Sequence, residues 1–291
     1  MMNRRAVAAI VFVVLLGMSG APPMAQEAQP PSFTILLAND DGYEAPGLKA
    51  LADALSSVAE LVVAAPASEQ SGTGHGITYR HPIMVRRIRR ADGIVWYAIQ
   101  ARPATCVRLA LEALMDEKPD LVISGINRGA NLGIVTFYSG TVAAAREAAF
   151  VGLPAIAVSM GGHDDADYRA TAAFVRRLVQ GLRSRRLMRP GLLLNVNVPA
   201  GIAHRFKGVR VTRLSLKVPG EDYERRVSPR GQMYFWNIYH PVKDDVEGTD
   251  VHAFARGFIS LTPLGIDQTR TADLDVFRPL AQSFGARAVH Q

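Results

Sequence analysis

Two carboxylates, Asp40 and Asp41, follow each other at the end of a short apolar segment, Phe33-Thr-Ile-Leu-Leu-Ala38, after the polar residue Asn39. Neighbouring carboxylates repel each other, which costs free energy unless a cation neutralises them. A hard divalent cation with oxygen ligands meets that need. The simpler alternative is a solvated turn, because Asp-Asp-Gly is also a common turn sequence. These residues therefore indicate either a metal site or an exposed turn.

Two glycine-containing clusters carry further polar groups that suit such a site. In residues 69–78, three glycines allow backbone N–H groups to approach an anion closely, and Ser71 offers an oxygen ligand or a donor. In residues 124–133, Asn127 and Asn131 supply amide oxygens, which a hard cation accepts beside carboxylates. Each cluster taken alone is also compatible with an ordinary glycine-rich turn.

A fourth cluster, Tyr138-Ser-Gly-Thr141, opens an expected helix. The N-terminus of a helix has free N–H groups and the positive end of the dipole, so it binds anions. Ser or Thr at this place is more often a simple helix cap. Independent coincidence of all four clusters is improbable, and together they predict a hard-metal site beside a phosphate-binding site.

An alternation of apolar segments and helical patterns places these clusters. The apolar segments resemble buried parallel strands, and apolar residues recur at helical spacing between them. The alternation predicts an α/β fold that is Rossmann-like, with a mostly parallel sheet and helices on both faces. In such a sheet, ligands bind at the carboxyl ends of the strands, where the clusters fall. The expected strands are 33–38, 61–65, 121–124, 155–159 and 192–198, and the expected helices lie around 48–55, 107–114, 141–150 and 174–182.

The pattern changes in the last third of the chain. Residues 200–262 have little helical periodicity but several β-prone segments, among them Met233-Tyr-Phe-Trp-Asn-Ile-Tyr239. We expect a Rossmann-like catalytic core over 33–199, an extended β-hairpin and oligomerisation region over 200–264, and a C-terminal segment over 265–291. A long hairpin rich in aromatic residues predicts a partner subunit that covers it.

The first 25 residues form a separate segment. Two arginines precede an uncharged run from Ala6 to Met18, and no charge returns before Glu27. This order is typical of a secretory signal peptide, and the apolar run is shorter than the span of about 20 residues that crosses a membrane. We predict a signal peptide over 1–25, a linker over 26–32, and an exported, periplasmic protein without a membrane span after cleavage.

Composition limits the remaining classes of function. Of the 291 residues, 48% are apolar and 20% are charged, which excludes a disordered or collagen-like chain. The one cysteine, Cys106, excludes an internal disulfide and cysteine-rich metal sites. The formal net charge of +7 suits an anionic small substrate. The sequence lacks the basic stripe interleaved with aromatic residues that would indicate a stable nucleic-acid partner.

Several segments of the chain resemble the signature sequences of the SurE family, also called survival protein SurE, whose members are metal-dependent nucleotidases. The resemblance extends from about residue 34 to residue 264 and keeps the segments in order. It implies a Rossmann-like fold with an extended C-terminal hairpin used for dimer or tetramer assembly. The segments are Ile35-Leu-Leu-Ala-Asn-Asp-Asp-Gly-Tyr-Glu-Ala-Pro-Gly47, Gln70-Ser-Gly-Thr-Gly74, Ser124-Gly-Ile-Asn-Arg-Gly-Ala-Asn-Leu-Gly133 and Tyr138-Ser-Gly-Thr141.

The resemblance also implies the chemistry. The expected reaction is hydrolysis of nucleoside 5′-monophosphates, and also of 3′-monophosphates and in some members short polyphosphate. One divalent ion per subunit, Mg²⁺ or Mn²⁺, activates the attacking water molecule, and Asp40 or Asp41 takes its proton. The implied metal ligands are Asp40, Asp41, Ser71 and Asn127, and the implied phosphate or substrate contacts are Asn39, Asn127, Ser139, Gly140 and Thr141.

Two features depart from the family pattern. Where the family commonly has Gly-Thr-Pro-Ala-Asp-Cys-Val, this chain has Ala101-Arg-Pro-Ala-Thr-Cys-Val107. Arg102 and Thr105 are expected to change nucleotide preference rather than hydrolysis, because they lie off the metal cluster. The predicted export is the second departure, since the family is usually cytoplasmic.

Other functional classes remain as alternatives. The first is an exported nucleotide- or phosphate-binding protein without turnover. A phosphatase that forms an aspartyl-phosphate requires Asp-x-Asp after the first strand, which the chain lacks. Among the histidines, only His75 in the glycine-rich cluster is expected near the substrate.

Overall fold

The computed structural model describes residues 33–203 and 207–284. The predicted signal peptide over 1–25 and the predicted linker over 26–32 lie outside the described residues and stay predictions. Within the described ranges, no helix has both the length and the apolar character to cross a membrane.

Nine strands of the described residues form one sheet in the order β3-β4-β2-β1-β5-β6-β7-β11-β8. The strands from β4 to β7 in this order run parallel to one another, whereas β3 and β11 pair with their neighbours β4 and β7 in antiparallel fashion. The predicted mostly parallel sheet is therefore confirmed. The strand bounds are β1 Thr34–Ala38, β2 Glu60–Pro66, β3 Val85–Arg89, β4 Val95–Ile99, β5 Leu121–Arg128, β6 Ala155–Met160, β7 Leu193–Val198, β8 Val209–Val211 and β11 Ile259–Pro263.

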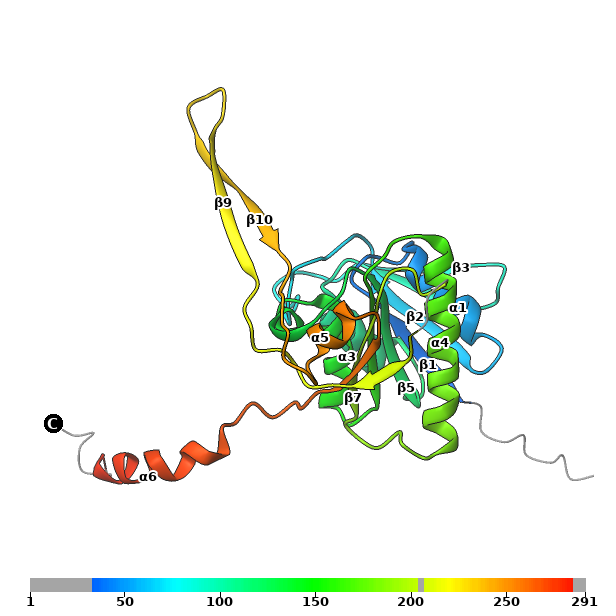
Figure 1. The fold of residues 1–291 in the computed structure, drawn as a ribbon. Helices are drawn as coiled ribbons and strands as arrows, with labels where there is room; N and C mark the ends of the chain where they lie inside the picture. Colours follow the sequence, from blue (N-terminus) through cyan, green and yellow to red (C-terminus); the bar gives the residue numbers. More distant parts are fainter. Residues whose placement is uncertain (1–32, 204–206, 285–291) are drawn as a thin grey trace, which may run out of the picture. The chain divides into compact units, whose positions relative to one another are not determined.

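Helices cover both faces of the sheet, as predicted (Figure 1). The helices α1 and α4 lie on one face, and α2 and α3 lie on the other. Side chains of β1 alternate between two cores, with Ile35 and Leu37 on the side of α1 and α4 and Leu36 and Ala38 on the opposite side. The bounds are α1 Pro46–Leu55, α2 Pro103–Leu109 with a π-helical turn at Ala110–Leu114, α3 Gly140–Phe150, α4 Asp165–Ser184, α5 Asp250–Ala255 and α6 Leu274–Ser283, with 3-10 turns at Gly133–Phe137 and Thr271–Asp273.

The point that matters for function is the boundary between β1 and β5. The chain leaves β1 for α1 on one face of the sheet and leaves β5 for α3 on the opposite face. Two neighbouring strands whose connections go to opposite faces open a crevice at their carboxyl ends, which is where doubly wound sheets bind ligands. Asn39, Asp40 and Asp41 follow β1 directly, and Asn127 is the penultimate residue of β5.

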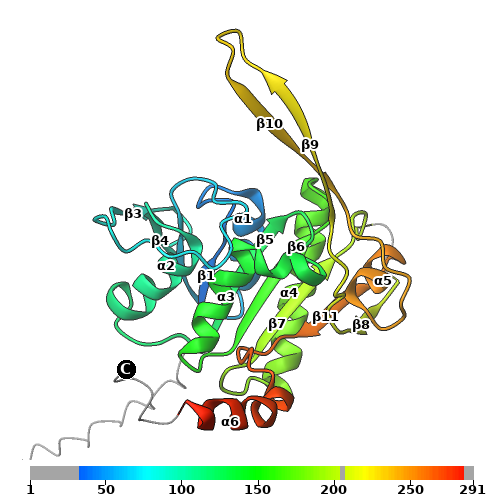
Figure 2. The ribbon, with the colours of Figure 1, turned by 90° about the vertical axis from the view of Figure 1, so that its left-hand side faces the viewer.

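The predicted division after residue 199 differs from the observed topology. The strand β11 pairs with β7, and β8 pairs with β11, so both complete the main sheet. Both strands are short and have no helical periodicity, which is why the sequence pattern placed them in the predicted hairpin region. Among the described residues, only β9 (Gly220–Val227) and β10 (Met233–His240) form a separate two-stranded sheet (Figure 2). Every residue of these two strands is exposed.

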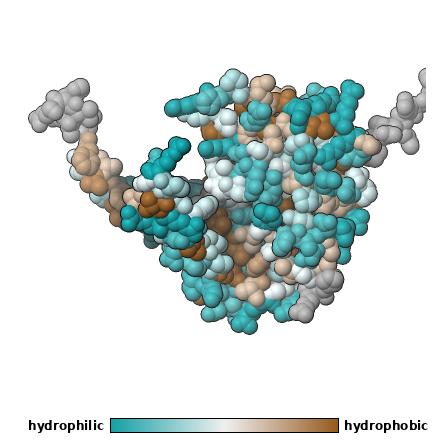
Figure 3. All heavy atoms as spheres, turned by 90° about the horizontal axis from the view of Figure 1, so that it is seen from above, coloured by the Kyte–Doolittle hydropathy of each residue, from teal (hydrophilic) through white to brown (hydrophobic). Residues whose placement is uncertain are grey.

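Exposed apolar side chains gather on two elements, β10 and α6. They include Phe235 and Trp236 on β10, and Val276, Phe277 and Leu280 on α6. Figure 3 shows brown and tan atoms along α6. Exposed apolar surface of this kind is typical of protein interfaces.

The buried carboxylate of Asp250 joins three segments that lie far apart in the sequence. It accepts hydrogen bonds from the backbone N–H groups of Gly133 (2.7 Å), Ser215 (2.9 Å) and Val251 (2.9 Å). Gly133 ends the loop that follows β5, and Ser215 lies in the segment that leads to β9. Asp250 therefore fixes the loop beside the crevice to the base of the hairpin.

Replacing this carboxylate should destabilise the protein. We expect Asp250→Ala to lower the free energy of unfolding by about 3 kcal/mol, because it leaves buried N–H groups without acceptors. Asp53→Ala, at an exposed position of α1, is the matched control and should change it by less than about 0.5 kcal/mol. Urea denaturation measures both. Equal stability of the two variants would contradict the role assigned to Asp250.

Candidate active site

Asp40 is buried where β1 meets the first turn of α3. Only 3% of its surface is exposed. The hydroxyl and the backbone N–H of Thr141 both donate to its carboxylate. A Cβ at Gly140 would lie 2.8 Å from the Asp40 Cβ and 2.9 Å from its Oδ2, so only glycine fits at this position. The close approach fixes the N-terminus of α3 against the end of β1.

The two carboxylates are difficult to hold ionised in this position. Burial raises the pKa of Asp40 to about 6, although the hydrogen bonds from Thr141 oppose the shift, and the charge of Asp41 raises it further. Burial also raises the pKa of Asp41, against the hydrogen bond that Arg128 N–H donates to its Oδ2 (3.0 Å). In the described ranges, no basic side chain forms an ion pair with either group. The pair therefore favours binding of a cation.

Asn127 and Asn39 present amide oxygens beside the carboxylates. The Asn127 side-chain N–H donates to the carbonyl of Gly129 (2.6 Å). The Asn39 side-chain N–H donates to the carbonyl of Gly42 (2.8 Å), and among the described residues its buried Oδ1 has no hydrogen-bond partner. Carboxylate and amide oxygens are the ligands that Mg²⁺ and Mn²⁺ prefer. The described residues contain no cluster of three or more His, Cys, Asp or Glu that could hold a metal ion.

The glycine-rich loop after β2 lies against both β1 and α3. The N–H of Gln70 donates to the carbonyl of Asp40 (2.8 Å), and the N–H of Gly74 donates to the carbonyl of Tyr138 (3.0 Å). Ser71 is exposed, and its hydroxyl donates to the Glu69 carboxylate (2.9 Å). Ser71 thus follows the residue that contacts the backbone of Asp40, and its hydroxyl hydrogen is already used by Glu69.

His75 holds this loop in place instead of facing the crevice. Its Nε2 lies 2.8 Å from the buried carboxylate of Glu147, and its ring stacks on Phe150 at 5.2 Å. Arg108 donates to the same carboxylate (2.6 Å). Burial raises the pKa of Glu147, but the hydrogen bonds from His75 and Arg108 lower it more, so the pKa lies below its ordinary value. The histidine expected near the substrate is thus a structural contact between the loop and α3.

Two of the polar side chains singled out in the sequence have structural partners. The hydroxyl of Ser139 accepts from the N–H of Val142 (3.1 Å), so it caps α3. Asn131, considered as a source of an amide oxygen, is buried in a network in which its side-chain N–H donates to the Ser159 hydroxyl (2.8 Å) and its backbone contacts Asn195 and Asn197. Asn131 therefore shapes the loop after β5 and does not join the carboxylates.

The residues that depart from the family pattern contact the far end of the glycine-rich loop. The hydroxyl of Thr105 accepts from Thr78 N–H (2.8 Å), and the hydroxyl of Thr78 accepts from Arg102 N–H (3.1 Å). A Cβ at Gly76 would lie 2.1 Å from a guanidinium nitrogen of Arg102. This arrangement agrees with their expected place off the carboxylate cluster, and their effect on nucleotide preference stays a prediction.

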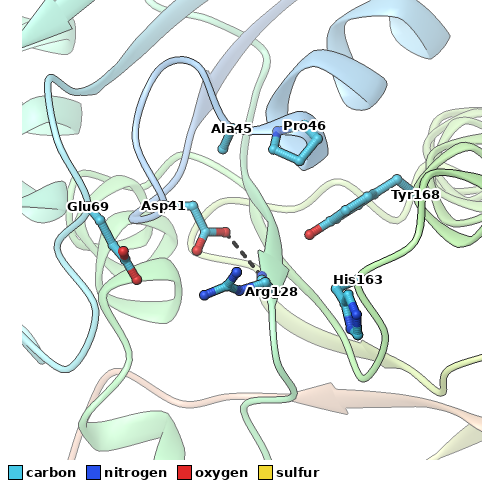
Figure 4. Close-up of a pocket in the computed structure, with 7 residues that line it drawn as sticks. All are labelled: Asp41, Ala45, Pro46, Glu69, Arg128, His163 and Tyr168. Atoms are coloured by element: carbon cyan, nitrogen blue, oxygen red, sulfur yellow. Dashed lines mark hydrogen bonds between the residues drawn. The ribbon is translucent and has the colours of Figure 1, made fainter.

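A pocket that the sequence did not reveal opens beside Asp41 (Figure 4). Tyr168 belongs to α4 and Arg128 to β5, while His163 precedes α4 and Glu69 belongs to the loop after β2. Tyr168 lies within a helical pattern and outside the polar clusters at the strand ends, so no local sequence signal assigned it to the site. Besides these residues and Asp41, the pocket is lined by Ala45 and Pro46.

The contact between Gly140 and Asp40 can be tested by stability. Gly140→Ala adds a methyl group where the Asp40 side chain lies, so we expect a loss of about 1–3 kcal/mol in the free energy of unfolding. Gly181→Ala in α4 is the control, because a Cβ there makes only an ordinary contact at 3.6 Å. This control should be unchanged or more stable. Two equally stable variants in guanidinium denaturation would contradict the close approach.

Comparison with known proteins agrees with this arrangement. The sequence pattern of the family described as "Survival protein SurE" matches residues 35–221. The chain is 45% identical over 249 residues to "5'-nucleotidase SurE" of Desulforudis audaxviator, covering 84% of this chain and 96% of that protein. It is 42% identical over 242 residues to the protein of the same name from Syntrophobacter fumaroxidans, covering 83% and 96%. The crystal structure of the SurE protein from Aquifex aeolicus superposes with a TM-score of 0.73 at 36% identity, covering 85% of this chain and 99% of that chain. With the fold and the order of its polar clusters in agreement, the chain belongs to the survival protein SurE family.

Proposed function

We propose that this protein is a metal-dependent nucleotidase, a phosphoric monoester hydrolase that acts on nucleoside 5′-monophosphates. The observation that carries the proposal is the carboxylate pair at the crevice between β1 and β5, which is close to the N-terminus of α3 and forms no ion pair with a basic side chain in the described ranges. The names of the relatives, 5′-nucleotidase SurE, support the substrate class. Cleavage of 3′-monophosphates and of short polyphosphate is proposed on the family resemblance alone.

The donor set suits one divalent cation per subunit, Mg²⁺ or Mn²⁺. Asp40, Asp41 and Asn127 would hold it directly, and Ser71 would contribute its hydroxyl oxygen from the edge of the site. The unpaired Oδ1 of Asn39 supports the presence of a further polar partner in the crevice. When bound, such a cation would neutralise phosphate charge and lower the pKa of a water molecule.

Side chains and backbone groups around the crevice would bind the phosphate, orient Asp40 and accept the proton of the water molecule. The start of α3, with Ser139, Gly140 and Thr141, directs the positive end of the helix dipole toward the crevice and favours the phosphate there. The Thr141 hydroxyl keeps Asp40 oriented, since it donates to that carboxylate. Asp41 lines the pocket, and its Oδ1 is not engaged by the Arg128 N–H. Asp41 is therefore better placed than Asp40 to take the proton of the attacking water.

Hydrolysis can be tested with Asp40→Asn. We expect the purified wild type to release phosphate from nucleoside 5′-monophosphates with Mg²⁺ or Mn²⁺ and to lose this activity in EDTA. Removing a charged ligand costs several kcal/mol of transition-state stabilisation, so the variant should lose about 1,000-fold in kcat/KM.

The melting temperature of Asp40→Asn shows whether a loss of activity comes from unfolding. An asparagine still accepts from Thr141 and no longer buries a charge, so its melting temperature in EDTA should equal or exceed that of the wild type. Near-normal turnover by Asp40→Asn would refute the metal assignment. Absence of release by folded wild type with every metal would instead favour the alternative, a nucleotide-binding protein without turnover.

We also propose that the protein assembles as a homodimer or homotetramer through the hairpin of β9 and β10. The double variant Phe235→Ser/Trp236→Ser removes two exposed aromatic rings of β10, so it should dissociate to a smaller species. Tyr79→Ser, at another exposed aromatic residue, is the control and should keep the wild-type mass. Light scattering coupled to size exclusion measures the masses. An unchanged mass of the double variant would contradict assembly through this hairpin.

A further inference from the structure

The pocket beside Asp41 is lined by one of the two carboxylates of the candidate site. Its volume is about 240 Å³. Pockets for drug-sized ligands usually enclose about 300–1,000 Å³, so this one is suited to a smaller group. A group of sugar size would fill it, while anything larger attached to that group would lie at its opening.

Tyr168 is the fixed polar group of this pocket. Only 3% of its surface is exposed, and a Cβ at Gly47 would lie 2.9 Å from its Cε1, so α1 and the ring are in close contact. Figure 4 shows its hydroxyl directed into the pocket, on the side of Asp41 and Arg128. No residue of the described ranges forms a hydrogen bond with this hydroxyl. The ring is thus held in place while its O–H faces the pocket and can donate to a group there.

The other walls complete a site for a polar, uncharged group. A tyrosine hydroxyl is protonated at neutral pH, so that of Tyr168 can donate a hydrogen bond. Ala45 and Pro46 give an apolar wall, while Glu69 and Asp41 offer acceptors. One small space is thus lined by a donor, two acceptors and an apolar wall. A ring that carries several hydroxyl groups can contact all of them.

We propose that this pocket binds the ribose of the nucleotide and that the Tyr168 hydroxyl forms a hydrogen bond with a ribose hydroxyl. The inference rests on the proposed nucleotidase function, because it takes the phosphate to lie at the carboxylate pair. Ribose is the group joined to that phosphate, and the pocket begins at Asp41. The base then lies at the opening, between the exposed side chains of Arg128 and His163.

The test measures the preference for ribose over deoxyribose in the wild type and in a variant that lacks the Tyr168 hydroxyl. For the wild type, AMP should exceed 2′-deoxy-AMP or 3′-deoxy-AMP about tenfold in kcat/KM, because a site built for a hydroxyl discriminates against an analogue that lacks it. Tyr168→Phe keeps the ring against Gly47 and removes only the oxygen. It should reduce the kcat/KM for AMP to that of the disfavoured deoxynucleotide, with no further loss on the deoxynucleotide itself.

Two comparisons separate this effect from general damage. Ethyl phosphate has no sugar, so its hydrolysis should be equal in the wild type and Tyr168→Phe. Tyr97→Phe, at a half-buried tyrosine of β4 whose hydroxyl lies 3.4 Å from the Leu114 carbonyl, is the matched control and should keep the ribose preference. Equal kcat/KM of the wild type for AMP and both deoxynucleotides would overturn the proposal.

Nucleoside binding provides a readout that does not require turnover. Calorimetry with adenosine should show weaker binding to Tyr168→Phe than to the wild type and to Tyr97→Phe. Equal affinities of the three proteins would overturn the ribose site even if hydrolysis is normal. If no phosphate ester is hydrolysed but adenosine binding depends on Tyr168, the nucleotidase proposal fails and the ribose site stands.

Discussion

The contact between Asp40 and the N-terminus of α3 determines how the rest of the site is arranged. The carboxylate is buried at the end of β1, accepts from Thr141, and approaches Gly140 so closely that no side chain fits there. Because β1 is packed on both faces, its end cannot move away from α3 without disturbing two cores. The position of Asp41 follows from the same contact, since it is the next residue on the chain.

The fold supplies this contact through its topology. The connections of β1 and β5 leave on opposite faces of the sheet, which opens the crevice and places Asn127 beside the carboxylates. The loop after β2 is held on the same edge by Gln70 and by the contact of His75 with Glu147. Burial makes the ionised carboxylates costly, so this arrangement favours the proposed divalent cation with oxygen ligands. The proposed cation would therefore also stabilise the folding of this edge.

The sequence predicted those parts of the molecule whose signal is local. The strand at 33–38 is a continuous apolar segment, and polar residues at strand ends identify the ligand-binding edge without further information. What it could not predict depends on residues far apart in the chain. Thr141 and Asp40 are separated by 101 positions and His75 and Glu147 by 72, and Tyr168 reaches the pocket only because α4 packs on α1. The return of β8 and β11 to the main sheet is another long-range pairing that short β-prone segments do not specify.

The central claim is that the carboxylate pair binds one divalent cation, and crystallography with Mn²⁺ tests it most directly. Anomalous diffraction from wild-type crystals soaked in Mn²⁺ should show one strong peak per subunit in contact with the carboxylates of Asp40 and Asp41 and with the Asn127 side-chain oxygen. A lysine or arginine side chain occupying that position, or a fully soaked crystal with no peak there, would contradict the account.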